Sequence, residues 1–221
     1  TLGVSTSGNS QIYNENFGDS FDCFRQGILA NGFDPGQGPW SVSASGLNGP
    51  VANQWYISNS ASGNGFVGGC VNDCFFGGQR TLHIGNSSGG SDQGAFYEEQ
   101  GNGVIFVTAT RAESPVGAID CTGSFNNTVT VRFAHNSQNV TDFARLEYFD
   151  GVNWSTLQNF NNSGLCFGGP NMNWDEVTNL PLPASANNNP NVRIGFNWFN
   201  DDSEVGAGLR GSVAIDFVRV D

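Results

Sequence analysis

The chain has 221 residues, of which 31 are glycine and only 13% are charged. Its 8 basic and 20 acidic residues give a formal net charge of −12, which disfavours binding to nucleic acid and to anionic membrane surfaces. The sequence contains no run of about 18 apolar residues, so we expect no insertion into a membrane. We expect a single domain over residues 1–221, with residues 1–11 as a flexible leader.

Short segments of alternating apolar and polar residues predict β-strands, and no segment indicates a helix. The first predicted strands, in chain order, are QIYNENF, NQWYISN, TLHIG, GAFYEE, VIFVTA and TVTVRFAH. DFARLEYFD and GVNWSTLQNF then form a hairpin that turns at Asp150-Gly151, and NVRIGFNW and GSVAIDFVRVD follow. About ten to twelve strands separated by Gly, Asn, Asp and Pro favour an all-β fold, namely a two-sheet antiparallel β-sandwich of the jelly-roll type.

The segment 34–50, DPGQGPWSVSASGLNGP, is predicted to be a long surface loop. Trp40 lies in this loop, so we expect its ring to be exposed and able to stack on a sugar. Trp198 continues the apolar face of Ile194 and Phe196, so we expect it in the core. Truncation of Trp198 should therefore cost more stability than truncation of Trp40.

The five cysteines are an odd number, so at least one stays unpaired within the chain. Cys70 and Cys74 enclose a short loop, and we expect them to form a disulfide, which indicates an extracytoplasmic protein. A zinc site needs about four ligands, and the sequence offers few histidines. Cys121 and Cys166 both lie at predicted strand ends, so we expect a second disulfide between them. Cys23 is left single.

Hydrolase chemistry has little support. His83 and His135 lie in or at the end of predicted strands, where a histidine is usually structural. Glu98 and Glu99 are adjacent in a strand and point to opposite faces, whereas paired glycosidase carboxylates converge on one bond. We therefore assign no catalytic residue.

Acidic residues gather near the end of the chain in two settings. Asp201 and Asp202 belong to FNDDSEVGAG, which is typical of a solvated turn. Asp216 lies within a predicted strand, where a carboxylate is costly unless it is paired or bound to a metal. Glu15 has the same setting near the start of the chain. Either acid could instead form a salt bridge to Arg193 or Arg219.

Several landmarks occur in a characteristic order: IYNENF, NQWYISN, CVNDC with TLHIG, RAESPVGAIDCTG, LEYFDGVNWSTL, LPASANNNPNVRIGFNWFNDD and GSVAIDFVRV. In these motifs the chain resembles the jelly-roll modules, similar to cleaved-adhesin and MAM-like domains, of large secreted or cell-surface proteins of Bacteroidetes-type bacteria. The resemblance covers roughly residues 12–220. Cys23 and the segment 24–50 depart from the pattern.

The resemblance implies a calcium-stabilised, non-catalytic adhesion module that is part of a larger polypeptide and lies outside the cell or on its surface. Its partner would be a carbohydrate or a cell-surface protein. We expect Glu15 and Asp216 to share one calcium ion with backbone carbonyls. Asp92 is a weaker third candidate, and Asp201 or Asp202 could serve a second site. The alternatives are a glycoside-active enzyme domain on a similar sandwich and a purely structural spacer.

Overall fold

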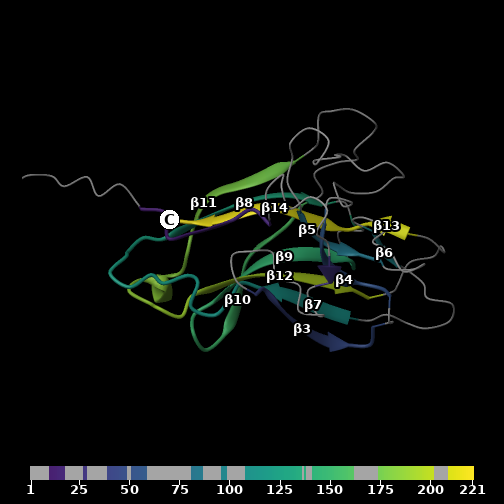
Figure 1. Ribbon diagram of the computed structural model, residues 1–221, viewed down its shortest axis with the longest axis horizontal. Helices are drawn as coiled ribbons and strands as arrows, with labels where there is room; N and C mark the ends of the chain where they lie inside the picture. Colours follow the sequence, from purple (N-terminus) through teal and green to yellow (C-terminus); the bar gives the residue numbers. More distant parts are fainter. Residues whose placement is uncertain are drawn as a thin grey trace, which may run out of the picture.

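Two antiparallel β-sheets and a separate two-stranded sheet form the described part of the structure, which is a computed structural model (Figure 1). It describes residues 10–17, 27–28, 39–48, 51–58, 81–86, 96–98, 108–135, 137, 141–161, 174–201 and 209–221. Within these residues the one helical element is the short 3-10 helix η5, Ala184–Ala186, and no helix is long and apolar enough to cross a membrane. The predicted all-β class with two antiparallel sheets is therefore confirmed.

The larger sheet has seven strands in the order β11-β8-β14-β5-β4-β2, with β1 paired to β14 beside this path. The strands span Asp175–Pro181 (β11), Thr128–His135 (β8), Val213–Val220 (β14), Thr81–Gly85 (β5), Gln54–Ser58 (β4), Gly27–Ile28 (β2) and Tyr13–Glu15 (β1). Glu15 lies opposite Val218, and His83 lies opposite Ala214. The short strands β1 and β5 therefore share one long side of β14.

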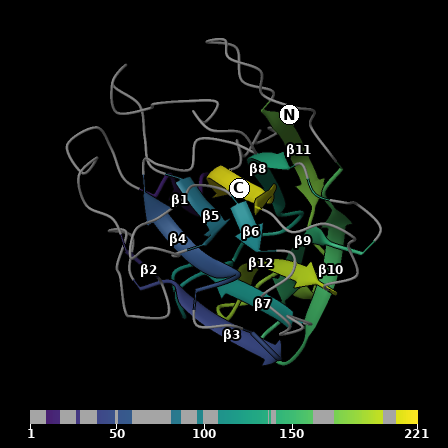
Figure 2. The same cartoon turned by 90° about the vertical axis from the view of Figure 1, so that its right-hand side faces the viewer.

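The smaller sheet has five strands in the order β10-β9-β12-β7-β3. They span Trp154–Asn159 (β10), Phe143–Phe149 (β9), Arg193–Asn200 (β12), Thr108–Glu113 (β7) and Ser41–Gly46 (β3). A separate pair joins β13 (Leu209–Gly211) to β6 (Phe96–Glu98). In Figure 2, which shows the molecule turned by 90°, β4 and β5 of the larger sheet lie to one side of β7, β9 and β12 of the smaller sheet.

The core fills the space between the two sheets. The larger sheet contributes residues such as Val131, Phe133 and Ile215, and β12 contributes Ile194 and Phe196. These residues occupy every second position of their strands, so the predicted alternation of β8 and β12 is confirmed. The other face of each strand points away from this core.

The predicted hairpin is also confirmed. Trp154 of β10 lies opposite Phe149 of β9, and Gly151 in the connecting turn has φ of 99°, which favours glycine. One carboxylate oxygen of Asp150 accepts hydrogen bonds from the backbone N–H groups of Val152 and Asn153, at 2.8 and 2.7 Å. These bonds lower the pKa of the Asp150 carboxyl, because they favour its charged form.

The prediction of one long surface loop over 34–50 was wrong. Residues Ser41–Gly46 form β3, which pairs along its whole length with β7. β3 is an edge strand with mostly exposed side chains, so it needs little apolar alternation and is rich in serine. Trp40, immediately before it, is buried in the core at 2% exposure.

Candidate functional site

The outer face of the five-stranded sheet carries a concentration of charged, amide and aromatic side chains. Since Ile194, Phe196 and Trp198 point into the core, the alternate residues of β12 lie on the outer face. Cross-strand register then produces three rows across β7, β12 and β9. They are Glu113–Gly195–Glu147, Arg111–Asn197–Arg145 and Ala109–Phe199–Phe143.

Ion pairs connect the first two rows into one network. Two carboxylates and three guanidinium groups take part. Glu113 receives Arg193 at 2.9 Å and Arg111 at 3.5 Å. Glu147 receives Arg111 at 2.6 Å and Arg145 at 3.3 Å. Asn197 Nδ2 also donates to Glu147 Oε1 at 3.0 Å. Glu147 is therefore the junction that holds two arginines in place.

The network is partly shielded from solvent, which fixes its geometry. The side chain of Glu147 is only 6% exposed, whereas that of Arg145 is 26% exposed. Charged hydrogen bonds in such a setting are stronger than those of fully exposed pairs. Because the groups already hold one another in position, a ligand would not need to order them on binding.

Trp154 lies at one end of this face, against Gly195. A Cβ atom on residue 195 would come within 2.7 Å of Trp154 Cζ3, so only glycine leaves room for the ring. The Arg111 guanidinium lies over the ring at 4.4 Å from its centroid, and the ring of Phe149 is 5.2 Å away. Trp154 is therefore held on the sheet surface by a cation–π contact and by a neighbouring ring.

A second pair of rings lies toward the other end of the face. Phe143 and Phe199 stack with centroids 4.8 Å apart and 17° between their planes. The Arg145 guanidinium covers Phe199 at 3.9 Å. The two arginines joined to Glu147 thus each contact one of the two aromatic groups.

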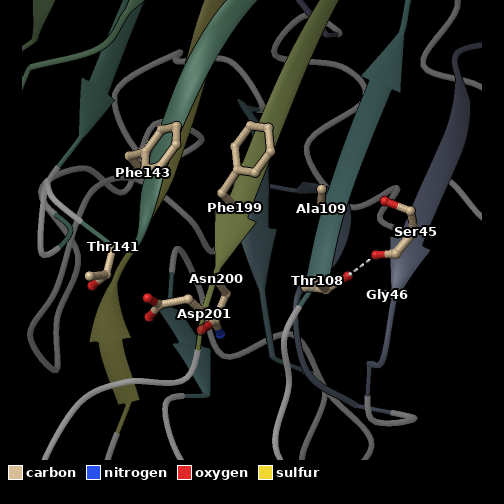
Figure 3. Close-up of a pocket in the computed structure, with 9 residues that line it drawn as sticks. All are labelled: Ser45, Gly46, Thr108, Ala109, Thr141, Phe143, Phe199, Asn200 and Asp201. Carbon is tan, nitrogen blue, oxygen red and sulfur yellow. Dashed lines mark hydrogen bonds between the residues drawn. The ribbon is translucent and has the colours of Figure 1, made fainter.

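A hollow of about 430 Å³ opens beside Phe143 and Phe199. Figure 3 shows the two rings next to each other on neighbouring strands, with polar side chains near the strand ends. The lining residues are Ser45, Gly46, Thr108, Ala109, Thr141, Phe143, Phe199, Asn200 and Asp201. Thr108 Oγ1 donates to the Ser45 carbonyl at 3.1 Å. The lining combines ring surface with hydroxyl, amide and carboxylate groups, which suits a ligand with an apolar side and many hydroxyls.

The charge of this face differs from that of the whole protein. Three of the eight basic residues of the chain lie here, Arg111, Arg145 and Arg193. They are opposed by Glu113, Glu147 and, at the hollow, Asp201. The face is therefore nearly neutral, while the chain carries −12.

The sequence pointed to Trp40 as the exposed aromatic residue, and the structure corrects this. Its ring centroid is 5.3 Å from that of Phe17 and 5.9 Å from that of Phe196. Trp40 immediately precedes the edge strand β3, and its ring lies in the core between the two sheets. At 2% exposure the ring of Trp40 offers no face on which a sugar could stack. Trp198 is buried as expected, and its Nε1 donates to Asn53 Oδ1 at 2.9 Å.

The structure separates Glu15 and Asp216, which were expected to share a calcium ion. Glu15 lies opposite Val218, whose side chain belongs to the core, and its Oε1 accepts a hydrogen bond from Phe17 N at 2.6 Å. Asp216 lies at a β-bulge between Ile215 and Phe217. A bulge shifts the direction of the side chains that follow it.

Asp216 instead forms a salt bridge to Arg132 at 3.2 Å, on the side of the sheet away from the core. Asp216 is therefore ion-paired, but its partner Arg132 is neither of the two arginines considered from the sequence. Arg193 and Arg219, the partners considered from the sequence, pair with Glu113 and Asp221. Glu15 and Asp216 do not fit one shared calcium site, because they lie on opposite faces of the sheet.

The other predicted site residues have different outcomes. Asp201 lines the hollow, and its backbone N–H donates to Asp142 Oδ1 at 3.0 Å. The remaining acidic candidates Asp92 and Asp202, and the cysteines Cys23, Cys70, Cys74 and Cys166, lie outside the described residues. Within the described part of the chain, no three His, Cys, Asp or Glu side chains gather as metal ligands do.

Cys121 is a free thiol buried in the core, which does not support its predicted disulfide with Cys166. Burial raises the pKa of this thiol to about 11, since the thiolate would be poorly solvated there. The thiol is therefore unreactive at neutral pH.

One contact has the composition of a hydrolase pair, because Ser137 Oγ lies 3.0 Å from His135 Nε2. The Ser137 hydroxyl, however, donates to the backbone carbonyl of Asp142. His135 is fully buried, and burial lowers its pKa to about 4. A buried neutral histidine whose serine neighbour binds a carbonyl is typical of a core polar contact rather than a nucleophile and its base.

Sequence reasoning did not find the network on the smaller sheet. Its signal was present in the polar positions of NVRIGFNW and RLEYF, where arginine and glutamate alternate with core residues. Only the register of three strands shows that these residues meet.

No protein-family model matches the chain, and no curated protein matches its sequence. The resemblance to jelly-roll adhesion modules therefore remains a prediction.

Proposed function

We propose that this protein is a non-catalytic ligand-binding module of the jelly-roll type that binds carbohydrate on the outer face of its five-stranded sheet. It would act outside the cell or at the cell surface, as part of a larger adhesion protein. The observation that carries the proposal is the hollow beside Phe143 and Phe199, whose stacked rings lie next to Asn200 and Asp201.

The chemistry of the hollow supports a sugar ligand. A sugar ring presents C–H groups on its faces and hydroxyl groups on its edge. Aromatic rings offer an apolar surface for the first, and the carboxylate of Asp201 and the hydroxyl groups of Ser45 and Thr141 offer hydrogen-bond partners for the second. The near neutrality of the face supports an uncharged ligand more than a phosphate-bearing one.

A glycan array, followed by titration calorimetry, tests the proposal. We expect wild type to bind at least one glycan without releasing products, and Phe199→Ala to weaken that binding about tenfold. Phe125→Ala is the matched control, because Phe125 is an exposed aromatic residue (60%) in the connection between β7 and β8, away from the hollow. It should bind as wild type does.

Each alternative gives a different result in these assays. Release of shorter sugars would indicate a glycoside-active enzyme. Binding to a surface protein but to no glycan would indicate a protein partner at this face, provided that Phe199→Ala weakens it. No binding to either would indicate a structural spacer. Glycan binding that is unchanged in both Phe143→Ala and Phe199→Ala would contradict the assigned site.

Calcium is a separate part of the proposal and has no assigned ligands. Calorimetric melting in calcium and then in chelator tests it. We expect a higher Tm in calcium for wild type and for Asp216→Asn alike, because Asp216 is held by Arg132. Equal melting in both conditions would remove calcium from the proposal. A calcium effect that disappears in Asp216→Asn would contradict the separation of the two acids.

A further inference from the structure

Two aromatic groups lie at different points along β12 on the outer sheet face, rather than in one cluster. The ring of Trp154 lies on Gly195, and Phe199 lies four residues further along β12. At the rise of an extended strand, this separation is roughly 13 Å. A single sugar ring is too small to contact both aromatic groups at this separation.

A continuous polar floor joins the two aromatic groups. Arg111 lies over Trp154 and Arg145 lies over Phe199, and both arginines bind Glu147. Asn197, between these arginines in its row, also binds Glu147. Along this face, Trp154 is therefore followed by the side chains that are bound to Glu147 and then by Phe199.

Gly195 indicates that the position of Trp154 is built into the strand. Glycine weakens the interior of a strand, and Gly195 is not among the described glycines with positive φ, so its backbone does not require glycine. Its absent side chain is what accommodates the ring, because a Cβ would also come within 2.9 Å of Arg111 Cδ. Residue 195 therefore has no side chain at the point where both Trp154 and Arg111 pack against β12.

We infer that this face binds an internal segment of a neutral, linear saccharide chain, which lies along β12 from the Phe143–Phe199 hollow to Trp154. The inference rests on the proposed function and deepens it. A linear chain repeats the same apolar faces and hydroxyl edges, so successive units can use the hollow, the floor and Trp154 in turn. A single sugar or a short chain end would use the hollow alone.

Titration calorimetry with three neutral oligosaccharide series tests this inference. The probes are cello-, xylo- and manno-oligosaccharides from the disaccharide to the hexasaccharide. For at least one series, we expect the affinity of wild type to rise with length and then level off. Trp154→Ala should lower the affinity for the hexasaccharide about tenfold and leave the affinity for the disaccharide unchanged. Phe199→Ala should lower both.

Gly195→Ala gives an independent check, because it keeps the indole but displaces it. It should reproduce the length-dependent loss of Trp154→Ala, and Phe125→Ala should show no loss. Thermal melting of each variant, with the binding temperature kept below every Tm, ensures that folded protein is compared.

Several outcomes would overturn the inference. They are equal affinity for short and long chains, an equal loss for both lengths in Trp154→Ala, or no loss in either Trp154→Ala or Gly195→Ala. Binding to none of the three series would also overturn it. In that case a different glycan bound in the array with dependence on Phe199 would leave the proposed function standing, and an array without any bound glycan would remove both.

Discussion

Core-facing and outward-facing residues alternate along the strands of both sheets, but the outer faces of the two sheets differ in their exposure to solvent. On the larger sheet, Tyr56, His83 and Ala214 form one row on the side away from the core, yet all three are buried. On the smaller sheet, the corresponding side carries the ion-paired rows and retains exposed guanidinium surface. Alternation thus identifies which face meets the core, but exposure of the other face depends on the rest of the fold.

The largest expected effect on stability distinguishes the core residues Trp40 and Trp198 from Trp154 on the outer face of the smaller sheet. Trp40→Ala and Trp198→Ala should each lower the free energy of unfolding by ~3–5 kcal/mol, because both remove a large buried side chain. Trp154→Ala should cost clearly less, since its ring lies on the sheet surface. Denaturant unfolding measures all three. If Trp40→Ala lowered the free energy of unfolding no more than Trp154→Ala does, the burial of Trp40 in the core would be contradicted.

The next effect is the acid sensitivity of the core at His135. Burial lowers its folded-state pKa to about 4, whereas the unfolded chain has a pKa of about 6.5. The unfolded state therefore binds more protons between these values, and stability is lost as the pH falls through this window, by up to roughly 3 kcal/mol.

Unfolding free energies of wild type and His135→Gln, measured from pH 7 to pH 4, test this expectation. The difference between the two proteins should change across the window, because glutamine does not titrate. A constant difference would show that His135 is protonated equally in the folded and unfolded states.

Gly195→Ala should have an intermediate effect, about 1–3 kcal/mol, because the added methyl group overpacks Trp154 and Arg111. The double variant with Trp154→Ala sharpens the assignment. If the clash with the ring causes the loss, Gly195→Ala should cost much less when Trp154 is absent. Equal costs in the two backgrounds would mean that the backbone of β12, and not the ring, requires glycine.

The smallest effect concerns Asp216 on the larger sheet. Burial raises the pKa of its carboxyl, and the nearby Arg132 opposes the shift. The folded state therefore holds this proton more tightly than the unfolded state does. Stability should fall slightly as the pH rises from about 4 through the raised pKa.

Asp216→Asn should lack this contribution, so its stability relative to wild type should rise over the same range of pH. The change should be small, because the charge and hydrogen bond of Arg132 offset part of the rise in pKa that burial causes. A change of the opposite sign would mean that the salt bridge outweighs burial.

The sequence by itself determined the strands whose two faces differ most. Val129, Val131 and Phe133, and likewise Ile194, Phe196 and Trp198, alternate with polar residues, so burial of one face is the only arrangement that shields them. The Asp150-Gly151 turn was equally clear, because glycine accommodates its positive φ without strain. These local signals sufficed for an all-β fold with two antiparallel sheets.

Tertiary structure decided everything that depends on contacts between distant segments. Trp40 is buried because β3 pairs with β7 along the sheet edge, which its serine-rich sequence did not predict. Asp216 leaves the face of Glu15 because of a bulge, and strand periodicity does not reveal bulges. The network around Glu147 joins residues from β7, β9 and β12. Register between strands is fixed by the packing of the whole core, so no single segment contains that information.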